Sequence, residues 1–189
     1  MAYATVTELK QYLGATTTTD DALLQSLLDR VTKRIEVYTR RVFEAATATR
    51  YYEPDALVNG VLWLDDDLVS ITTLSNGDSD ATEIESDEYW LMPRNAGPPY
   101  WGIRLLSAAD SSWEWDTDCW VSVLGTWGYC ASPPADVVHA TLRWGQYCYL
   151  QKDAPVFETI AMPEAGIIAI PQGIPADVVE ILKPYRRLV

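Results

Sequence analysis

The chain has 189 residues but only one histidine and three cysteines, and these shortages exclude several kinds of catalytic and metal site. A serine triad would need a strained Gly-x-Ser-x-Gly turn to accompany His139, and the sequence contains none. The cysteines are odd in number and lack Cys-x-x-Cys spacing, which argues against a disulfide scaffold and a zinc ribbon. A Cys3His zinc site is the alternative, but its four residues would show no paired-ligand spacing. We therefore expect a structural histidine, no metal or other cofactor, and buried thiols at Cys119, Cys130 and Cys148.

Phosphate-binding glycine loops are also missing, because neither Gly-x-x-x-x-Gly-Lys-[Ser/Thr] nor Gly-x-Gly-x-x-Gly occurs. No run of about 18 uncharged apolar residues is present, so we expect no membrane span. The opening residues, Met-Ala-Tyr-Ala-Thr-Val-Thr-Glu, lack the basic and apolar blocks of a signal peptide. We expect a protein that stays or assembles in the cytoplasm.

Basic residues are scarce, with 14 Lys and Arg against 27 Asp and Glu, and the net charge of −13 is unevenly distributed. Residues 51–131 contain fifteen acidic and two basic side chains, whereas the segments on either side are close to neutral. Nucleic-acid binding requires clustered Lys and Arg. The middle of the chain is therefore expected to repel DNA.

Two helices are predicted at the N-terminal end. Thr5 and Glu8 fit a capping box, and Gly14 can end the first helix in a left-handed conformation. A longer helix follows, with apolar residues at the helical period over about five turns. Those apolar positions are Leu24, Leu27, Leu28, Val31, Ile35, Tyr38 and Val42.

A second, basic stripe follows the same long helix. It is either a solvated flank or a contact surface for an acidic partner, such as the acidic middle of a neighbouring copy. Its members are Arg30, Lys33, Arg34 and Arg41.

From about residue 49 to residue 129 the pattern changes to short strand-like runs separated by turn residues, which predicts a mostly antiparallel sheet. The three consecutive acids Asp65, Asp66 and Asp67 fall between two such runs, so we expect a solvated turn rather than a calcium loop. The carboxylates of Glu114 and Asp116 beside Trp113 and Trp115 leave a carbohydrate-binding module or a carboxylate-dependent hydrolase open. Core packing or an interface is the alternative for these tryptophans. The expected strands are 49–53, 61–64, 68–74, 88–92, 101–106 and 119–124.

The sequence Pro-Ala-Asp-Val-Val occurs at 134–138 and again at 175–179, and both copies are typical of a first helical turn. The first opens a helix to about Gln151, in which Gly145 is unfavourable by about 1 kcal/mol unless a neighbour packs closely on it. The second opens a short helix that Pro184 ends. Between them, residues 153–173 are expected to form a connector or arm containing an apolar run of Ile167, Ile168, Ala169 and Ile170.

These elements predict an α+β fold in which a small helical bundle, with an N-terminal helix pair and C-terminal helices, carries a large antiparallel β insertion. The expected divisions are residues 1–48 for the N-terminal helices, 49–131 for the β insertion, 132–152 for the central helix, and 153–189 for the connector, short helix and C-terminal arm.

The order of these parts resembles the head-tail connector proteins of tailed bacteriophages, also called adaptor or head-completion proteins. Thr5-Val-Thr-Glu-Leu-Lys-Gln-Tyr-Leu13, followed by residues 18–28 and 36–41, is similar to their opening. Residues 133–140 look like their central helix, and residues 174–187 like their closing helix and tail. The β insertion is larger and richer in tryptophan than the family's usual pattern.

The resemblance implies a non-enzymatic structural protein of the virion neck, assembled in the host cytoplasm. It implies a homo-oligomeric ring, typically of twelve copies, that lies below the portal protein and lets DNA pass without binding it specifically. The next stopper or tail-terminator protein would dock on it. The portal-contact candidates are Lys183, Pro184, Tyr185, Arg186 and Arg187; the inter-subunit candidates are the basic stripe with Ile167, Ile168 and Ile170; and Asp65, Asp66 and Asp67 are candidates for an acidic channel wall or surface.

Overall fold

The computed structural model describes residues 2–117, 119–152, 159–162, 166–169 and 173–187. The chain divides into two compact units, which we call the helical unit (Met1–Arg40 with Pro133–Val189) and the β unit (Arg41–Ser132). The predicted α+β fold, with helices from both ends of the chain and an antiparallel β insertion, is confirmed.

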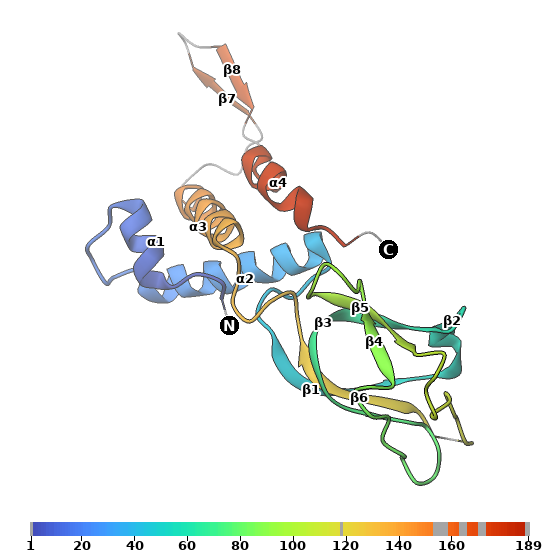
Figure 1. Cartoon of the computed structure of the whole chain (residues 1–189). Helices are drawn as coiled ribbons and strands as arrows, with labels where there is room; N and C mark the ends of the chain where they lie inside the picture. The colour runs from blue at the N-terminus through green and yellow to red at the C-terminus, as the bar shows by residue number, and fades with distance from the viewer. Residues whose placement is uncertain (1, 118, 153–158, 163–165, 170–172, 188–189) are drawn as a thin grey trace. The chain divides into compact units, whose positions relative to one another are not determined.

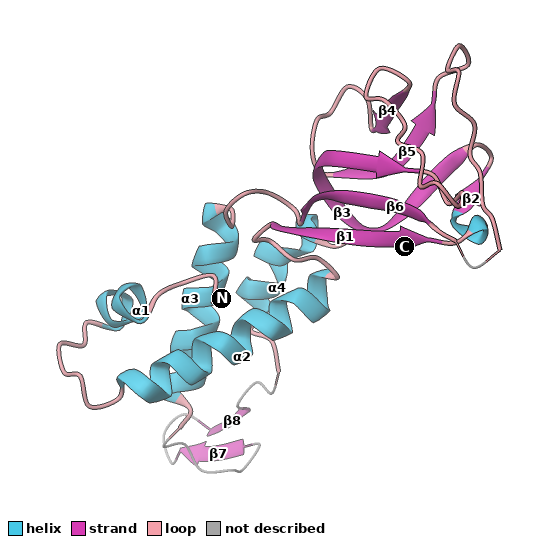
Figure 2. Cartoon of the chain, turned by 90° about the horizontal axis from the view of Figure 1, so that it is seen from below, coloured by secondary structure: helices cyan, strands magenta, loops and turns pink. Residues whose placement is uncertain are grey.

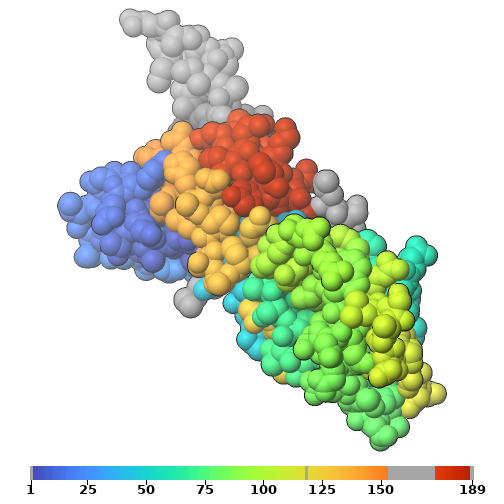
Figure 3. Space-filling model, viewed as in Figure 1, coloured from blue at the N-terminus to red at the C-terminus, as the bar shows by residue number. Residues whose placement is uncertain are grey.

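The helical unit contains α1 (Val6–Leu13), α2 (Asp21–Thr39), α3 (Ala135–Leu150) and α4 (Ala176–Leu182), followed by the 3-10 helix η2 (Lys183–Tyr185). Helix α3 packs against α1, α2 and α4 (Figure 1), and the space-filling view shows it between α1 and α4 (Figure 3). Apolar side chains from segments far apart in the sequence therefore share one interior. Its fully buried members include Leu9, Leu28, Val31, Ile35, Val137, Ala140, Trp144, Val178 and Leu182.

The predicted caps of α1 are confirmed. The Thr5 hydroxyl accepts a hydrogen bond from the Glu8 amide at 3.2 Å, and the Glu8 carboxylate accepts one from the Thr5 amide at 2.7 Å. Gly14 ends the helix at φ 69°, a left-handed conformation that glycine adopts without steric cost.

Helix α2 ends earlier than the apolar period predicts. Arg40 adopts the left-handed conformation, with φ 55°, and ends the helix after Thr39. The prediction that Arg41 continues the basic stripe of this helix is therefore wrong, because Arg41 already belongs to the β unit.

The two copies of Pro-Ala-Asp-Val-Val begin α3 and α4, with each proline at the N-cap position. The aspartate of each copy accepts a hydrogen bond from a residue that follows the other copy in the chain. Arg143 of α3 donates from Nε to Asp177 of α4 at 2.6 Å, and the Tyr185 hydroxyl donates to Asp136 of α3 at 3.2 Å. The repeat thus fixes two helix starts and also supplies the polar contacts that join them.

Gly145 lies in the middle of α3, where the side chains of Leu9 and Leu28 pack against it. A Cβ atom at this position would lie 3.4 to 3.5 Å from their methyl groups, which is ordinary contact distance. Because there is room for a methyl group, the close packing does not by itself require glycine.

The connector contains a two-stranded antiparallel hairpin of β7 (Thr159–Met162) and β8 (Gly166–Ala169). Ile167 and Ile168 are in β8, where they pair with Ala161 and Ile160, and Ile170 lies outside the described residues.

The β unit is a six-stranded antiparallel sheet (Figure 2). Its strands are β1 (Ala46–Tyr52), β2 (Leu57–Val58), β3 (Val61–Ser75), β4 (Tyr89–Met92), β5 (Tyr100–Leu105) and β6 (Val121–Trp127), with the short 3-10 helix η1 (Pro54–Ala56) before β2. The order is β1-β6-β3-β5-β4, with β2 paired to β3.

The long strand β3 joins the two halves of this sheet. Its first residues pair with β5, and its residues from Leu68 to Ser75 pair with β6. The prediction of two separate strands with a turn between them is wrong, since both runs belong to β3. One core collects side chains from both halves: Tyr52, Leu62, Leu64, Leu68, Leu74, Ile84, Ile103, Val121, Val123 and Trp127.

Candidate interaction surfaces

The consecutive acids of the β unit lie at an irregularity of β3, where the strand advances five residues between its pairs with Gly102 and Tyr100 of β5. The interpretation as a turn is wrong because all three residues belong to β3, and of the three only Asp65 is mostly solvated. The Asp65 side chain is 66% exposed, that of Asp66 is 20% exposed, and that of Asp67 is 3% exposed. Asp67 is therefore not an exposed surface group.

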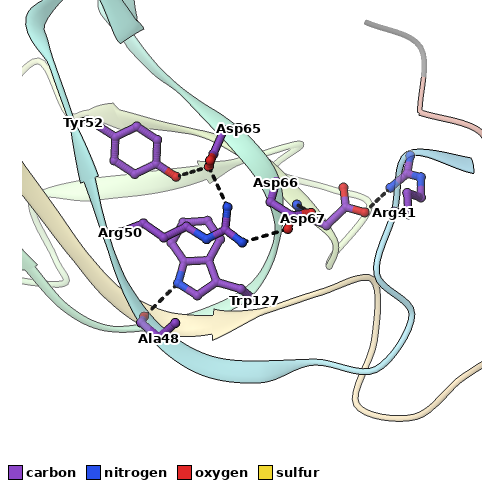
Figure 4. A network of polar contacts seen from close by, with 8 residues as sticks. All are labelled: Arg41, Ala48, Arg50, Tyr52, Asp65, Asp66, Asp67 and Trp127. Atoms are coloured by element: carbon purple, nitrogen blue, oxygen red, sulfur yellow. Dashed lines mark hydrogen bonds and ion pairs between the residues drawn. The ribbon is translucent and has the colours of Figure 1, made fainter. Parts of the chain in front are cut away.

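Two arginines hold these carboxylates in place (Figure 4). Arg50 of β1 contacts Asp65 at 2.9 Å and Asp66 at 2.8 Å, and its guanidinium lies 4.6 Å from the Trp127 ring centroid. Arg41 contacts the buried carboxylate of Asp67 at 2.6 Å. Arg41, predicted as an inter-subunit residue, is thus engaged inside its own unit.

Tyr52 of β1 belongs to the same network, and its hydroxyl group donates a hydrogen bond to the Asp65 carboxylate at 2.8 Å. Burial, followed by the hydrogen bond and the negative charge of Asp65, raises the pKa of the Tyr52 phenol well above its ordinary value. The folded chain therefore keeps this proton at a pH at which the unfolded chain, with a tyrosine pKa of about 10, loses it.

We expect the stability that Tyr52 contributes to be complete below pH 10 and to be lost as the pH rises above this value, because only the unfolded chain then releases the proton. Tyr52→Phe should unfold at lower denaturant than the parent chain at neutral pH, by about 1 kcal/mol for the lost hydrogen bond. Above about pH 10 the difference should shrink. Tyr51→Phe, at a residue that is 65% exposed, is the control. A Tyr52→Phe deficit that stays constant between pH 8 and 11 would contradict the assignment.

The basic residues of α2 border a groove on the helical unit. Arg34 lies over the Trp144 ring at 5.8 Å. Arg30 and Arg34 both lie near Cys148 of α3. Burial raises the pKa of the Cys148 thiol, and the positive charges of the two arginines partly oppose this rise. Lys33 contacts Glu36 at 2.7 Å. The groove holds about 550 Å³ and is lined almost entirely by apolar surface. We call it the α2 groove; its lining residues are Lys33, Arg34, Val37, Tyr38, Trp144, Gly173 and Ile174.

The C-terminal candidates lie against the helical unit up to Arg187. Arg186 stacks over Tyr38 of α2 at 5.2 Å, and the Arg187 amide donates to the Thr39 carbonyl at 2.9 Å. Lys183 and Pro184 of η2 are exposed. The tail therefore presents a basic, partly exposed surface beside the end of α2.

Exposed aromatic pairs occur on the β unit. The rings of Trp63 and Trp101 stack with centroids 4.9 Å apart, and those of Tyr51 and Trp120 meet edge to face at 6.3 Å. Trp63 is 47% exposed and Trp120 is 49% exposed. Water-exposed tryptophans of this kind are typical of binding surfaces.

The other aromatic candidates belong to the core. Trp113 and Trp115 pack against the interior of the β unit, and the Trp115 indole donates to the Tyr52 carbonyl at 3.2 Å. Asp116 accepts a hydrogen bond from the Ser79 amide, and Glu114 accepts one from the Ser112 hydroxyl. The core-packing alternative for these two tryptophans is confirmed.

The cysteines are free and half-buried rather than fully buried. Burial raises the pKa of the Cys130 and Cys148 thiols. His139 meets the Tyr12 ring edge to face at 6.0 Å. Across the described ranges, no group of three His, Cys, Asp or Glu side chains is placed to hold a metal ion. No helix in the described part of the chain has the length and apolar character needed to span a bilayer.

An α+β chain with an apolar groove, a basic tail and exposed aromatic pairs has the features of a protein that works through contacts with other proteins. Residues 3–74 match the family of phage gp6-like head-tail connector proteins. The predicted resemblance to head-tail connectors is confirmed over that range. A comparison with curated proteins gives no match.

Solved structures share the fold. Among them are the neck of an empty GTA particle computed with C6 symmetry (22% identity, TM-score 0.65), the neck of a native GTA particle computed with C12 symmetry (20%, 0.63), and the virion of a native gene transfer agent (GTA) particle (21%, 0.65). Each likeness covers 97% of this chain and 88% or 89% of the other chain. The shared fold therefore includes the β unit, which the sequence pattern set apart from the family.

Sequence reasoning missed the α2 groove and the Tyr51–Trp120 pair. Val37 is apolar but 80% exposed. Its position beside Arg34 on the helical wheel was the signal in the sequence that could have indicated an apolar patch next to the basic stripe. Trp144 and Ile174 join Val37 only through the packing of α3 and the start of α4, which no local pattern predicts.

Proposed function

We propose that this chain is a structural protein of the neck of a phage-like particle, where copies form a ring below the portal. The ring extends the DNA channel and offers a docking surface to a stopper or tail-terminator protein. The observation that carries the proposal is the likeness of 97% of the chain to chains of GTA necks. The connector-family match at residues 3–74 points to the same role.

Symmetry supports the ring. The similar necks were computed with C6 and C12 symmetry, and we propose twelve copies for this chain. A ring with cyclic symmetry and more than two members requires two different complementary surfaces on each copy. The chain offers several: the α2 groove, the basic tail and the exposed aromatic pairs.

Charge supports passage of DNA without binding. The β unit carries sixteen acidic and four basic side chains, a net charge of −12, and its four arginines are too few to hold a phosphate backbone. Exposed carboxylates such as Asp65 repel phosphates and keep the duplex free to slide. The role requires no catalysis and no cofactor, and its place is the virion neck, after assembly in the host cytoplasm.

The portal contact is proposed for the basic tail, residues Lys183 to Arg187. We expect the purified chain to bind the isolated portal protein and to appear as a ring on one face of it in negative-stain images. Deletion of residues 184–189 should weaken this binding by about tenfold or more, since a clustered charge and an aromatic ring are lost together.

The tail also contacts its own unit, so the deletion needs a matched control. Tyr185→Phe removes the hydrogen bond to Asp136 but keeps the ring and the charges, and it should bind the portal like the parent chain. Unchanged binding by the deletion variant would refute the tail assignment. A chain that does not bind the portal at all would refute the proposed function.

A carbohydrate-binding role has one observation in its favour, the exposed stack of Trp63 on Trp101. Sugars bind on the free face of such rings. Titration with oligosaccharides should leave the tryptophan fluorescence unchanged if the neck proposal is correct, whereas saturable quenching would favour the carbohydrate role.

A further inference from the structure

The floor of the α2 groove is apolar, and part of it is exposed to water. Val37 is 80% exposed, the largest exposed fraction among the large apolar side chains of the described residues. Tyr38 and Ile174, which are half-buried, continue this apolar surface, and the buried Trp144 also lines the groove. The free energy falls when such a surface is covered by another apolar surface.

Lys33 and Arg34 make the rim of the groove basic, and Arg30 lies one turn before Arg34 in α2. Within the described part of the chain, no carboxylate forms an ion pair with Arg30 or Arg34. Both are exposed, and the Arg34 guanidinium is held over the Trp144 ring. The groove therefore fits a partner that combines apolar rings with carboxylates.

One surface of the β unit has this composition. Tyr51 is 65% exposed and Trp120 is 49% exposed, and their rings are in edge-to-face contact. Glu53 follows in an extended conformation, so alternation along the backbone puts its side chain on the same side as that of Tyr51. Glu53 is exposed and forms no ion pair with any residue that the structure describes. We call Tyr51, Glu53 and Trp120 the aromatic corner.

We propose that the α2 groove of one copy receives the aromatic corner of the next copy in the ring. The rings of Tyr51 and Trp120 cover Val37 and Tyr38, and the Glu53 carboxylate pairs with Arg34. This inference rests on the proposed function and names one interface of the ring.

Three arguments favour a second copy as the occupant. The two surfaces match in both apolar character and charge, and the corner belongs to a unit with a net charge of −12, which orients its approach to a basic rim. The groove and the corner are different patches of one chain, as a ring interface requires. Tyrosine, tryptophan and arginine are also the residue types that contribute most binding energy at protein interfaces.

Photo-cross-linking in the portal-bound complex tests the contact directly. Benzoylphenylalanine replaces Val37, whose exposure makes the change compatible with folding, and the same group at Asp29, an exposed position about two turns earlier in α2, is the control. We expect position 37 to cross-link to a peptide of another copy that contains residues 51–53 or 119–121, and position 29 not to do so.

Other cross-links separate the alternatives. A link from position 37 to the portal, to residues 153–172 of the same chain, or to another region of a sister copy would overturn this inference while leaving the ring intact. A portal-bound complex without a ring would instead contradict the proposed function.

A charge exchange tests the same interface without a probe. Arg34→Glu and Glu53→Arg should each raise, by about tenfold or more, the protein concentration at which portal particles acquire complete rings. The double variant should recover most of that loss, because the pair is restored with reversed charges. Arg104→Glu, at an exposed position of β5, makes the same charge change and should have little effect. A double variant no better than the weaker single variant would overturn the inference, and circular dichroism checks that each variant is folded.

Discussion

Gly125→Ala is expected to destabilise the β unit by about 2 to 3 kcal/mol. A Cβ atom on Gly125 of β6 would lie 2.5 Å from the Ser70 carbonyl oxygen and 2.9 Å from a methyl group of Leu68. The first of these atoms belongs to the backbone of β3, and β3 pairs with β6 through register shifts on both sides of this point. The clash can be relieved only if the two central strands move apart.

Denaturant unfolding followed by tryptophan fluorescence measures this loss, since seven of the eight tryptophans lie in the β unit. Gly145→Ala is the matched control in the helical unit. Its added methyl group finds ordinary contact distances, and alanine favours a helix over glycine by about 1 kcal/mol, so this variant should be as stable as the parent chain or more stable. Equal losses for the two variants would contradict the strand packing described above.

Asp67→Asn should cost about 3 to 5 kcal/mol, because it removes one partner of a buried ion pair and leaves the other charge uncompensated. The Asp67 side chain is 3% exposed and that of Arg41 is 18% exposed, so water replaces little of the lost interaction. The measurement is the free energy of unfolding of the β unit at neutral pH.

Asp65→Asn provides the control two residues away. Its side chain is 66% exposed, and an exposed ion pair contributes less than about 1 kcal/mol. The two variants change the same charge in the same strand, so a difference between them reports burial. Similar losses would show that the buried pair with Arg41 does not stabilise the β unit as proposed.

Local signals were enough to predict most helices. The capping box of Thr5 and Glu8, the glycine at position 14 and the two Pro-Ala-Asp-Val-Val starts act within a few residues, and each is found where the sequence indicated. The period of α2 was also read correctly as far as Thr39. Its end was missed because a left-handed arginine at position 40 has no sequence signature comparable to a glycine.

The β unit was predictable in its strand-forming segments but not in its pairing. The joining of two expected strands into β3 depends on its partners β5 and β6, which begin only at Tyr100 and Val121. The burial of Asp67 depends on Arg41 in the same way. Three consecutive acids are ordinarily solvated, and only tertiary structure shows that a partly buried arginine faces one of them.

The candidate surfaces followed the same division. Arg30, Lys33 and Arg34 were found from helical spacing, and the structure adds the apolar groove that Lys33 and Arg34 border. The resemblance to connector proteins was recognised from the order of the helices along the chain. This order is kept even where the sequence identity to a solved neck chain is about 20%, a level at which individual motifs become ambiguous.

Cryo-electron microscopy of the neck of the particles that carry this chain is the most direct test of the central claim. The account predicts a ring of copies immediately below the portal, in which density fits both the helical unit and the β unit and the α2 groove of each copy is covered by its neighbour. A neck whose density below the portal is filled by other chains, with no ring of this one, would contradict it.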